Sequence, residues 1–177
     1  MCIRDRSGPS DACLGYRMPC QRKVLSLFLV LSAFGSAASA EQSILGTCFA
    51  VGPEGEILTA NHVVADAPRV QIRFEDGRPE DAALEAASAS TDIALLRVAR
   101  STPDYLPLAP PRSGKLGQRV FTLGYPLSLL LGSKVKFTEG SISALSGRAD
   151  DASWLQVSVP LQPGNSGGPI VSEAGRV

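Results

Sequence analysis

The chain has 177 residues, with 17 Lys and Arg against 17 Asp and Glu, so its formal net charge at pH 7 is zero. This balance gives no reason to expect nucleic acid as a partner, and polypeptide is the partner class that we expect. A chain of this length can build one large or two small hydrophobic cores, which indicates a globular protein.

An export signal is the first feature along the chain. Arg22 and Lys23 precede an apolar run over 24–31, and small residues follow it up to Ala40. A basic start, a short apolar stretch and an Ala-Ser-Ala ending are typical of a secretory signal peptide. We predict a signal peptide over 18–40 that is cleaved after Ala40. No second apolar span follows, so we expect no membrane association after removal of the signal.

Residues 1–17 fit no part of this signal, because Met18 begins its basic region cleanly. We interpret 1–17 as a non-native or mis-assigned start. Removal of the leader would leave Cys48 as the one cysteine of the mature chain, which excludes an intramolecular disulfide there. We expect Cys48 to be a small buried residue rather than a reactive thiol.

Short strands separated by Gly, Pro and Asp turns are predicted for residues 41–102. Apolar residues alternate or run together over 46–51, 56–59, 70–74, 82–87 and 93–98. This spacing is typical of antiparallel strands, and we interpret 41–102 as a first β-barrel. His62 would lie on a brief turn or helix after the second of these strands.

Prolines interrupt residues 103–116, which we predict to be a linker without regular structure. The remaining 117–177 contain predicted strands at 119–123 and 137–145, and a third segment that leads into a glycine-rich loop. The apolar segment 127–132 is predicted to be a buried turn or strand; the alternative is an exposed loop for substrate or partner contact.

Three side chains supply the groups that a serine nucleophile needs. Ser166 lies in the run Pro-Gly-Asn-Ser-Gly-Gly-Pro, and His62 is the one histidine of the chain. A serine hydroxyl needs a neighbouring imidazole to take its proton, and the imidazole needs a carboxylate on its other nitrogen. Asp92 is our candidate for this carboxylate, because it opens an apolar strand that would fix its position.

The glycines of the loop suggest a second element of catalysis. Hydrolysis of an amide creates a negatively charged oxygen, which converging backbone N–H groups stabilise. We expect the N–H groups of Gly164 and Ser166 to form this oxyanion hole, since glycine tolerates the backbone conformations that such convergence requires.

The order His62, Asp92, Ser166 and the residues around each resemble the trypsin-like serine proteases of the bacterial HtrA/Deg type, over 46–177. The resemblance implies an all-β fold of two antiparallel β-barrels, with the active site in the cleft between them. Secreted animal trypsins have Cys after the histidine and Asp before the serine, whereas this chain has Val63 and Asn165. Activation by a new amino terminus is therefore not expected, and control would lie in loop ordering.

The resemblance further implies a secreted, periplasmic serine endopeptidase that works through an acyl-enzyme, with no cofactor and no metal. Its partners would be polypeptide substrates, including unfolded proteins, and homo-oligomer formation is left open. Two alternatives remain, a catalytically silent trypsin-like module that binds polypeptides and a structural β-barrel. Since the chain stops soon after Ser166, we expect the second barrel to be truncated at the C-terminus and inactive until about fifty downstream residues are added.

Overall fold

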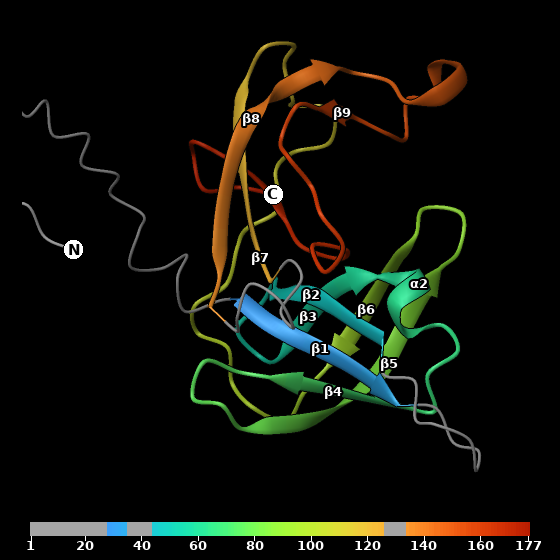
Figure 1. Cartoon of the computed structure of the whole chain (residues 1–177), viewed down its shortest axis with the longest axis vertical. Coiled ribbons are helices and arrows are strands. Elements are labelled where there is room, and N and C mark those ends of the chain that lie inside the picture. The colour runs from blue at the N-terminus through green and yellow to red at the C-terminus, as the bar shows by residue number, and fades with distance from the viewer. Residues whose placement is uncertain (1–27, 35–43, 126–133) are drawn as a thin grey trace, which may run out of the picture.

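The structure is a computed structural model that describes residues 28–34, 44–125 and 134–177, and in these ranges it is almost entirely β. Figure 1 shows a barrel with a second sheet beside it. The proposed start at 1–17, the cleavage site after Ala40 and the apolar segment 127–132 lie outside the described residues.

The first unit is a closed antiparallel barrel with the strand order β1-β2-β3-β6-β5-β4. Its strands are β1 (Phe28–Phe34), β2 (Ile44–Ala50), β3 (Glu56–Ala60), β4 (Arg69–Arg73), β5 (Pro79–Ser88) and β6 (Ile93–Arg97). Every second residue of β3, β4 and β6 is buried, as a strand with one face on a core requires. The predicted strands of 41–102 are confirmed.

Strand β1 comes from the segment that the sequence predicts to be a signal peptide. It pairs with β2 on one side and with β4 on the other, and these two pairings close the barrel. The same short apolar run can be interpreted as part of a signal peptide or can form a strand of a barrel. The reason is that a strand buried in a sheet and the apolar part of a leader have similar compositions.

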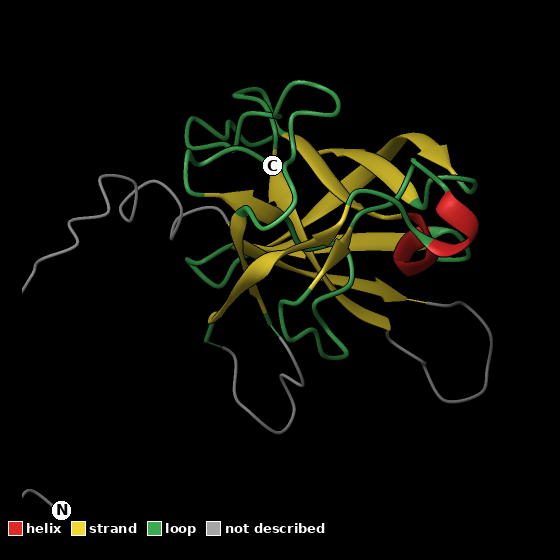
Figure 2. Cartoon of the chain, turned by 90° about the horizontal axis from the view of Figure 1, so that it is seen from above, coloured by secondary structure: helices red, strands yellow, loops and turns green. Residues whose placement is uncertain are grey.

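The second unit is a four-stranded antiparallel sheet with the order β10-β7-β8-β9, which does not close into a barrel within the described residues. Its elements are β7 (Arg119–Gly124), β8 (Lys136–Ala144), the short helix η1 (Arg148–Asp150), β9 (Gln156–Val157) and β10 (Ile170–Ser172). Residues 103–116 contain no helix or strand. Figure 2 shows how little of the chain is helical.

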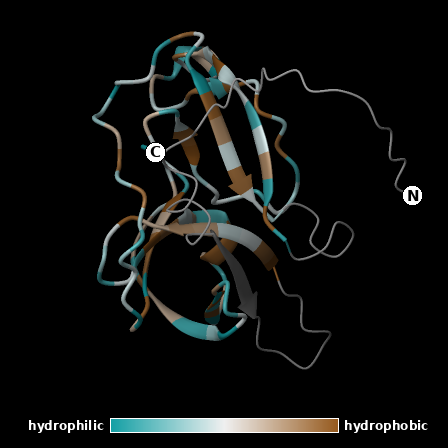
Figure 3. Ribbon diagram, turned by 90° about the vertical axis from the view of Figure 1, so that its left-hand side faces the viewer, coloured by the Kyte–Doolittle hydropathy of each residue, from teal (hydrophilic) through white to brown (hydrophobic). Residues whose placement is uncertain are grey.

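The hydrophobic core belongs mainly to the barrel. Hydrophobic stretches of ribbon occur on both units (Figure 3). The larger buried cluster includes Ile57, Ile72 and Leu96, each fully buried, whereas the second sheet has a separate cluster of Val120, Ile142 and Val159. None of the helices in the described ranges is long and apolar enough to span a membrane.

Candidate active site

His62 lies on a single helical turn that follows β3, named α2 (Asn61–Val64). Val63 and Val64 are buried and hold the turn against the barrel, whereas the side chain of His62 is 58% exposed. The predicted turn or helix at His62 is confirmed. The helical turn thus fixes the backbone of His62, while its imidazole ring is open to solvent and to a substrate.

Strand pairing brings Asp92 next to His62. Ala60, at the end of β3, pairs with Ile93, at the start of β6, so the residues that flank this pair are neighbours. The carboxylate of Asp92 accepts a hydrogen bond from the His62 backbone N–H at 2.8 Å, and its other oxygen lies 2.7 Å from His62 Nδ1. Asp92 has a φ of 53°, a left-handed conformation that Asp and Asn tolerate better than most residues.

Two opposing influences act on the carboxyl group of Asp92. Burial alone would raise its pKa, but the hydrogen bonds from the His62 backbone and ring outweigh burial and lower the pKa below its ordinary value. Asp92 is therefore a carboxylate at neutral pH and can only accept hydrogen bonds. It follows that the proton of a neutral His62 ring is on Nδ1 and that Nε2 has a free lone pair.

The loop that contains Ser166 is tied to the first barrel. The backbone N–H of Thr47, in β2, donates to the Ser166 carbonyl at 2.8 Å, and Thr47 Oγ1 donates to the Gly164 carbonyl at 2.6 Å. Within the loop, the N–H of Gly168 donates to the Asn165 carbonyl at 2.8 Å. Thr47 was not among the residues predicted from the sequence; the one available signal is a threonine inside an otherwise apolar strand.

Two glycines of the loop have backbone conformations that other residues rarely adopt, with φ of 98° at Gly164 and 82° at Gly167. The backbone N–H groups of Gly164 and Ser166 donate no hydrogen bond to any part of the chain that the structure describes. Ser166 lines the pocket that His62 also lines, whereas Gly164 is not among the residues that line it.

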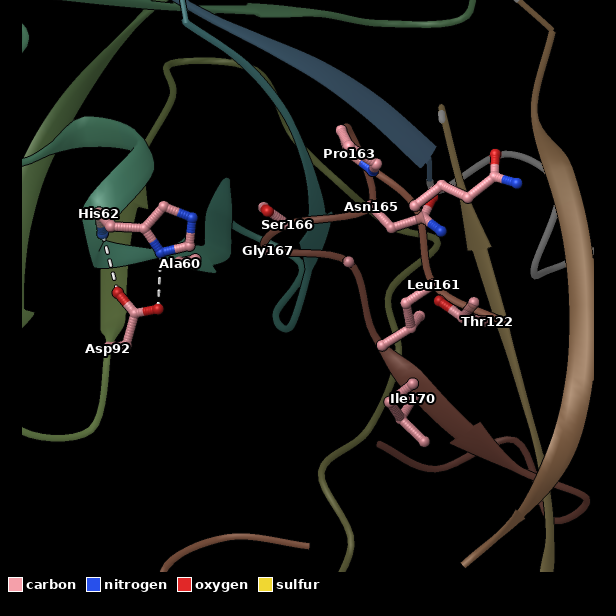
Figure 4. A pocket seen from close by; sticks show the side chains of 12 residues that line it. Ala60, His62, Asp92, Thr122, Leu161, Pro163, Asn165, Ser166, Gly167 and Ile170 are labelled. Atoms are coloured by element: carbon pink, nitrogen blue, oxygen red, sulfur yellow. Dashed lines mark hydrogen bonds and ion pairs between the residues drawn. The ribbon is translucent and has the colours of Figure 1, made fainter. Parts of the chain in front are cut away.

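One pocket brings these groups together. Its lining includes His62 and Asp92 from the barrel and Ser166 from the second unit, and its far end is formed by Leu161 and Ile170. Figure 4 shows the His62 ring between Asp92 and the loop that carries Ser166. No hydrogen bond joins the side chains of His62 and Ser166 in the described structure. The pocket thus holds all three predicted catalytic side chains, with His62 and Asp92 already in contact.

Cys48 lies directly beside Thr47 on β2 and is fully buried, as predicted. Burial raises the pKa of its thiol far above the ordinary value, so the reactive thiolate is not formed at neutral pH. Among the described residues, no group of His, Cys, Asp and Glu side chains could hold a metal ion.

Comparison with known proteins agrees with this geometry. The chain is 36% identical over 143 residues to an uncharacterized protein, y4bJ, of Sinorhizobium fredii, and 34% identical over 140 residues to a probable periplasmic serine endoprotease, DegP-like, of Pseudomonas fluorescens. These matches cover 81% and 77% of this chain but only 22% and 29% of the two relatives. The chain therefore spans less than a third of either relative.

Among solved structures, the serine endoprotease from Yersinia pestis matches with a TM-score of 0.73 and 28% sequence identity, over 94% of this chain and 57% of that one. The family model for the trypsin-like peptidase domain matches residues 46–177. This match takes in most of β2, all of the later strands and every residue of the pocket. The chain belongs to the trypsin-like peptidase domain family.

Proposed function

We propose that the chain is the catalytic part of a serine endopeptidase, in which Ser166 is the nucleophile, His62 the general base and Asp92 its partner. The observation that carries this proposal is the 2.7 Å contact between His62 Nδ1 and Asp92 in a pocket that Ser166 also lines. Membership of a trypsin-like peptidase family supports the same assignment. The domain limits predicted from the sequence, 41–102, 103–116 and 117–177, are part of this proposal, although the barrel in the structure also includes β1, which precedes residue 41.

In the first half of the reaction, Ser166 Oγ attacks the carbonyl carbon of the scissile peptide bond. Its proton passes to Nε2 of His62, which has the free lone pair, and the charge of Asp92 stabilises the imidazolium that results. When the tetrahedral intermediate collapses, the C–N bond breaks and the imidazolium gives its proton to the leaving amine. The acyl group remains on Ser166 as an ester.

The N–H groups of Gly164 and Ser166 stabilise the negatively charged oxygen of that intermediate. Each donor of this kind contributes roughly a hundred- to a thousand-fold in rate. Both groups are free of hydrogen bonds to the described chain, which supports this role. In the second half of the reaction, a water oxygen attacks the acyl carbon of the ester while His62 takes a proton from that water. The C–O bond to Ser166 then breaks, the imidazolium returns the proton to Ser166 Oγ, and the new carboxylic acid leaves.

The substrates that we propose are polypeptides, including unfolded ones, and the location is the bacterial periplasm. Relatives named as periplasmic endoproteases support the location, as does the signal-like sequence ahead of Ala40. Mass measurement of the exported protein would test cleavage after Ala40 directly. Cleavage there would remove β1, and a mature protein that begins at any residue other than Glu41 would contradict the cleavage site.

The assignment is tested in the full-length gene product with the variants Ser166→Ala and His62→Ala. Both should abolish cleavage of a fluorescently labelled, denatured protein and labelling by a fluorophosphonate probe, since the probe reacts only with an activated serine. Thermal unfolding should change little, because both side chains lie in an open pocket rather than a core. Ser90→Ala, on an exposed turn of the barrel, is the matched control and should keep full activity.

Two outcomes separate the alternatives. Cleavage that persists in both variants would show that another group is the nucleophile. A folded protein that binds unfolded polypeptide but is neither labelled nor active would instead support the catalytically silent module.

A further inference from the structure

Thr47 connects the two halves of the pocket, although it does not line it. Its side chain is fully buried in β2. Oγ1 donates to the Gly164 carbonyl at 2.6 Å and accepts a hydrogen bond from the backbone N–H of Tyr125 at 3.3 Å. Its own carbonyl accepts a hydrogen bond from Thr59 Oγ1 at 2.9 Å. Thr47 therefore joins two strands of the barrel, the end of β7 and the Ser166 loop.

The two bonds from Thr47 to the loop have a specific geometric consequence. They hold the carbonyl oxygens of Gly164 and Ser166. The first carbonyl belongs to the peptide group before the Asn165–Ser166 peptide, and the second belongs to the peptide group after it. That central peptide carries the Ser166 N–H, one of the two oxyanion donors. With both neighbouring peptide planes fixed, rotation of the central one is restricted, and its own carbonyl is held by the Gly168 N–H.

The loop and β7 pack closely around Thr47. A Cβ added to Gly167 would collide with the Thr47 carbonyl oxygen and with Thr59 Oγ1. A Cβ on Gly124 would lie 3.3 Å from Thr47 Oγ1, and one on Gly168 would lie 3.2 Å from Thr47 Cγ2. Three glycines thus allow the loop and β7 to approach Thr47 closely.

We infer that Thr47 is a positioning residue for catalysis: its hydroxyl and backbone N–H aim the Ser166 N–H into the pocket and set the place of Ser166 relative to His62. This inference rests on the proposed function. His62 and Asp92 belong to the barrel, whereas Ser166 belongs to the second unit, so alignment of the three requires a link between the units. Thr47 provides that link through hydrogen bonds of defined direction.

A purely structural threonine of the same chemistry exists elsewhere in the barrel. Thr102 is also buried, its Oγ1 donates to the Gly52 carbonyl at 2.6 Å, and it accepts a hydrogen bond from the Gly55 N–H at 3.0 Å. Thr102 does not line the pocket. The substitutions Thr47→Val and Thr102→Val each remove one buried donor and one buried acceptor, so they form a matched pair.

The test compares both variants in the full-length protein, with hydrolysis of a denatured, fluorescently labelled protein and the rate of fluorophosphonate labelling as readouts. Thr47→Val should lower kcat and the labelling rate about 10- to 100-fold, with KM nearly unchanged, because misplacement of catalytic groups by about 1 Å has effects of this size. Thr47→Ser should restore most of the rate. Thr102→Val should keep the native kcat, although both valine variants lower the unfolding temperature.

Several results would overturn the inference. It is wrong if Thr47→Val keeps the native kcat, or if Thr102→Val loses kcat to the same degree. Should Thr47→Val fail to fold, Thr47→Ser and Thr47→Ala make the same comparison, because both lack the methyl group and differ only in the hydroxyl; equal kcat values for these two would refute the role. A native protein without Ser166-dependent cleavage would instead refute the proposed function, and the role of Thr47 with it.

Discussion

The two units of the molecule differ in how they hold the side chains of the pocket. The barrel is closed and has a large buried core, and it fixes His62 and Asp92 through strand pairing and a short helix. The second sheet is open within the described residues. Val120, Ile142 and Val159 form a small cluster of its own, whereas its buried Leu123 and Val171 pack in the larger cluster with the barrel. Several of its large apolar side chains are about half exposed, among them Phe137, Trp154 and Leu161.

This difference shows that the Ser166 loop depends on both units. In the part of the chain that the structure describes, a hydrogen bond from Thr122 Oγ1, in β7, to the Pro169 carbonyl at 2.7 Å connects the far end of the loop to its own sheet. The barrel holds the centre of the loop through Thr47. Damage to the barrel should therefore affect all three side chains proposed to be catalytic, whereas damage to the sheet should affect mainly the far wall of the pocket.

The largest expected effect concerns Asp92, a residue that the barrel holds beside His62. Asp92→Asn should lower kcat roughly ten-thousand-fold, because a neutral amide does not hold the ring tautomer that leaves Nε2 free to accept a proton. Asparagine tolerates the left-handed backbone at this position, so the unfolding temperature should stay close to the native value. Steady-state hydrolysis measures the expected fall in kcat, and thermal unfolding of the same preparation measures the expected constancy of the unfolding temperature. A variant that retains a tenth of the native kcat would refute the role of Asp92.

The next prediction compares the two cores by making the same replacement, isoleucine by alanine, in each. Ile57, in the barrel, is fully buried, and Ile142, in the second sheet, is 4% exposed. Replacement of a buried isoleucine by alanine lowers the free energy of unfolding by about 2–5 kcal/mol, and the loss grows with the size of the cavity that remains. We expect Ile57→Ala near about 4 kcal/mol and Ile142→Ala near about 2 kcal/mol, since the looser sheet can collapse around the gap. Urea denaturation measures both, and equal losses would contradict the contrast between the cores.

Much of the first unit could be predicted from the sequence, because its strands show the alternation that a closed sheet imposes. The helix at His62 and the strand that follows Asp92 are where the residue patterns predict them. Strand β1 could not be predicted in this way. Its apolar run has the composition of a leader, and nothing local shows that β2 and β4 leave room for a strand between them.

In the pocket, the residues proposed to be catalytic could be named from the sequence because each is of a type that a known chemical step requires, and the structure brings all three to one pocket. Thr47 could not be recognised, since its role depends on contacts with residues more than a hundred positions later in the chain. A threonine in a strand is usually interpreted as a β-former, and only the fold shows which carbonyl groups its hydroxyl and N–H meet. Residues that position others are therefore harder to predict than residues that react.

A smaller effect tests the contact surface between the units. Gly167→Ala would place a methyl group against the Thr47 carbonyl and Thr59 Oγ1, in addition to the strain of a left-handed alanine. Gly77 has a similar φ of 77°, but a Cβ there meets nothing within 4 Å. The strain alone is about 1–2 kcal/mol, and overpacking adds about 1–3 kcal/mol more. We expect Gly167→Ala to lose activity and more stability than Gly77→Ala; equal unfolding temperatures would mean that the surface is not tight.

The smallest effect is the response of the barrel to acid, which follows from its surface ion pairs. Asp81 forms a salt bridge with Arg69, and hydrogen bonds from this arginine lower the pKa of Asp81 below its ordinary value. Arg100 acts in the same way on the pKa of Asp76. Since these pKa values are lower in the folded than in the unfolded state, the pairs stabilise the fold above about pH 4, and that contribution is lost as the pH falls further.

The unfolding temperature should therefore be steady from neutral pH to about 5 and decline below about pH 4. Each exposed ion pair contributes little to stability. Arg69→Met should therefore lower the unfolding temperature slightly at neutral pH and hardly at all in acid, so that the decline between the two becomes slightly smaller. Far-UV circular dichroism follows the strands of both units, whereas fluorescence of Trp154, the one tryptophan, reports the second sheet. Because the sheet shares part of its buried core with the barrel, through Leu123 and Val171, the two signals should change together; fluorescence that stays native after the strands are lost would show that the sheet is stable without the barrel.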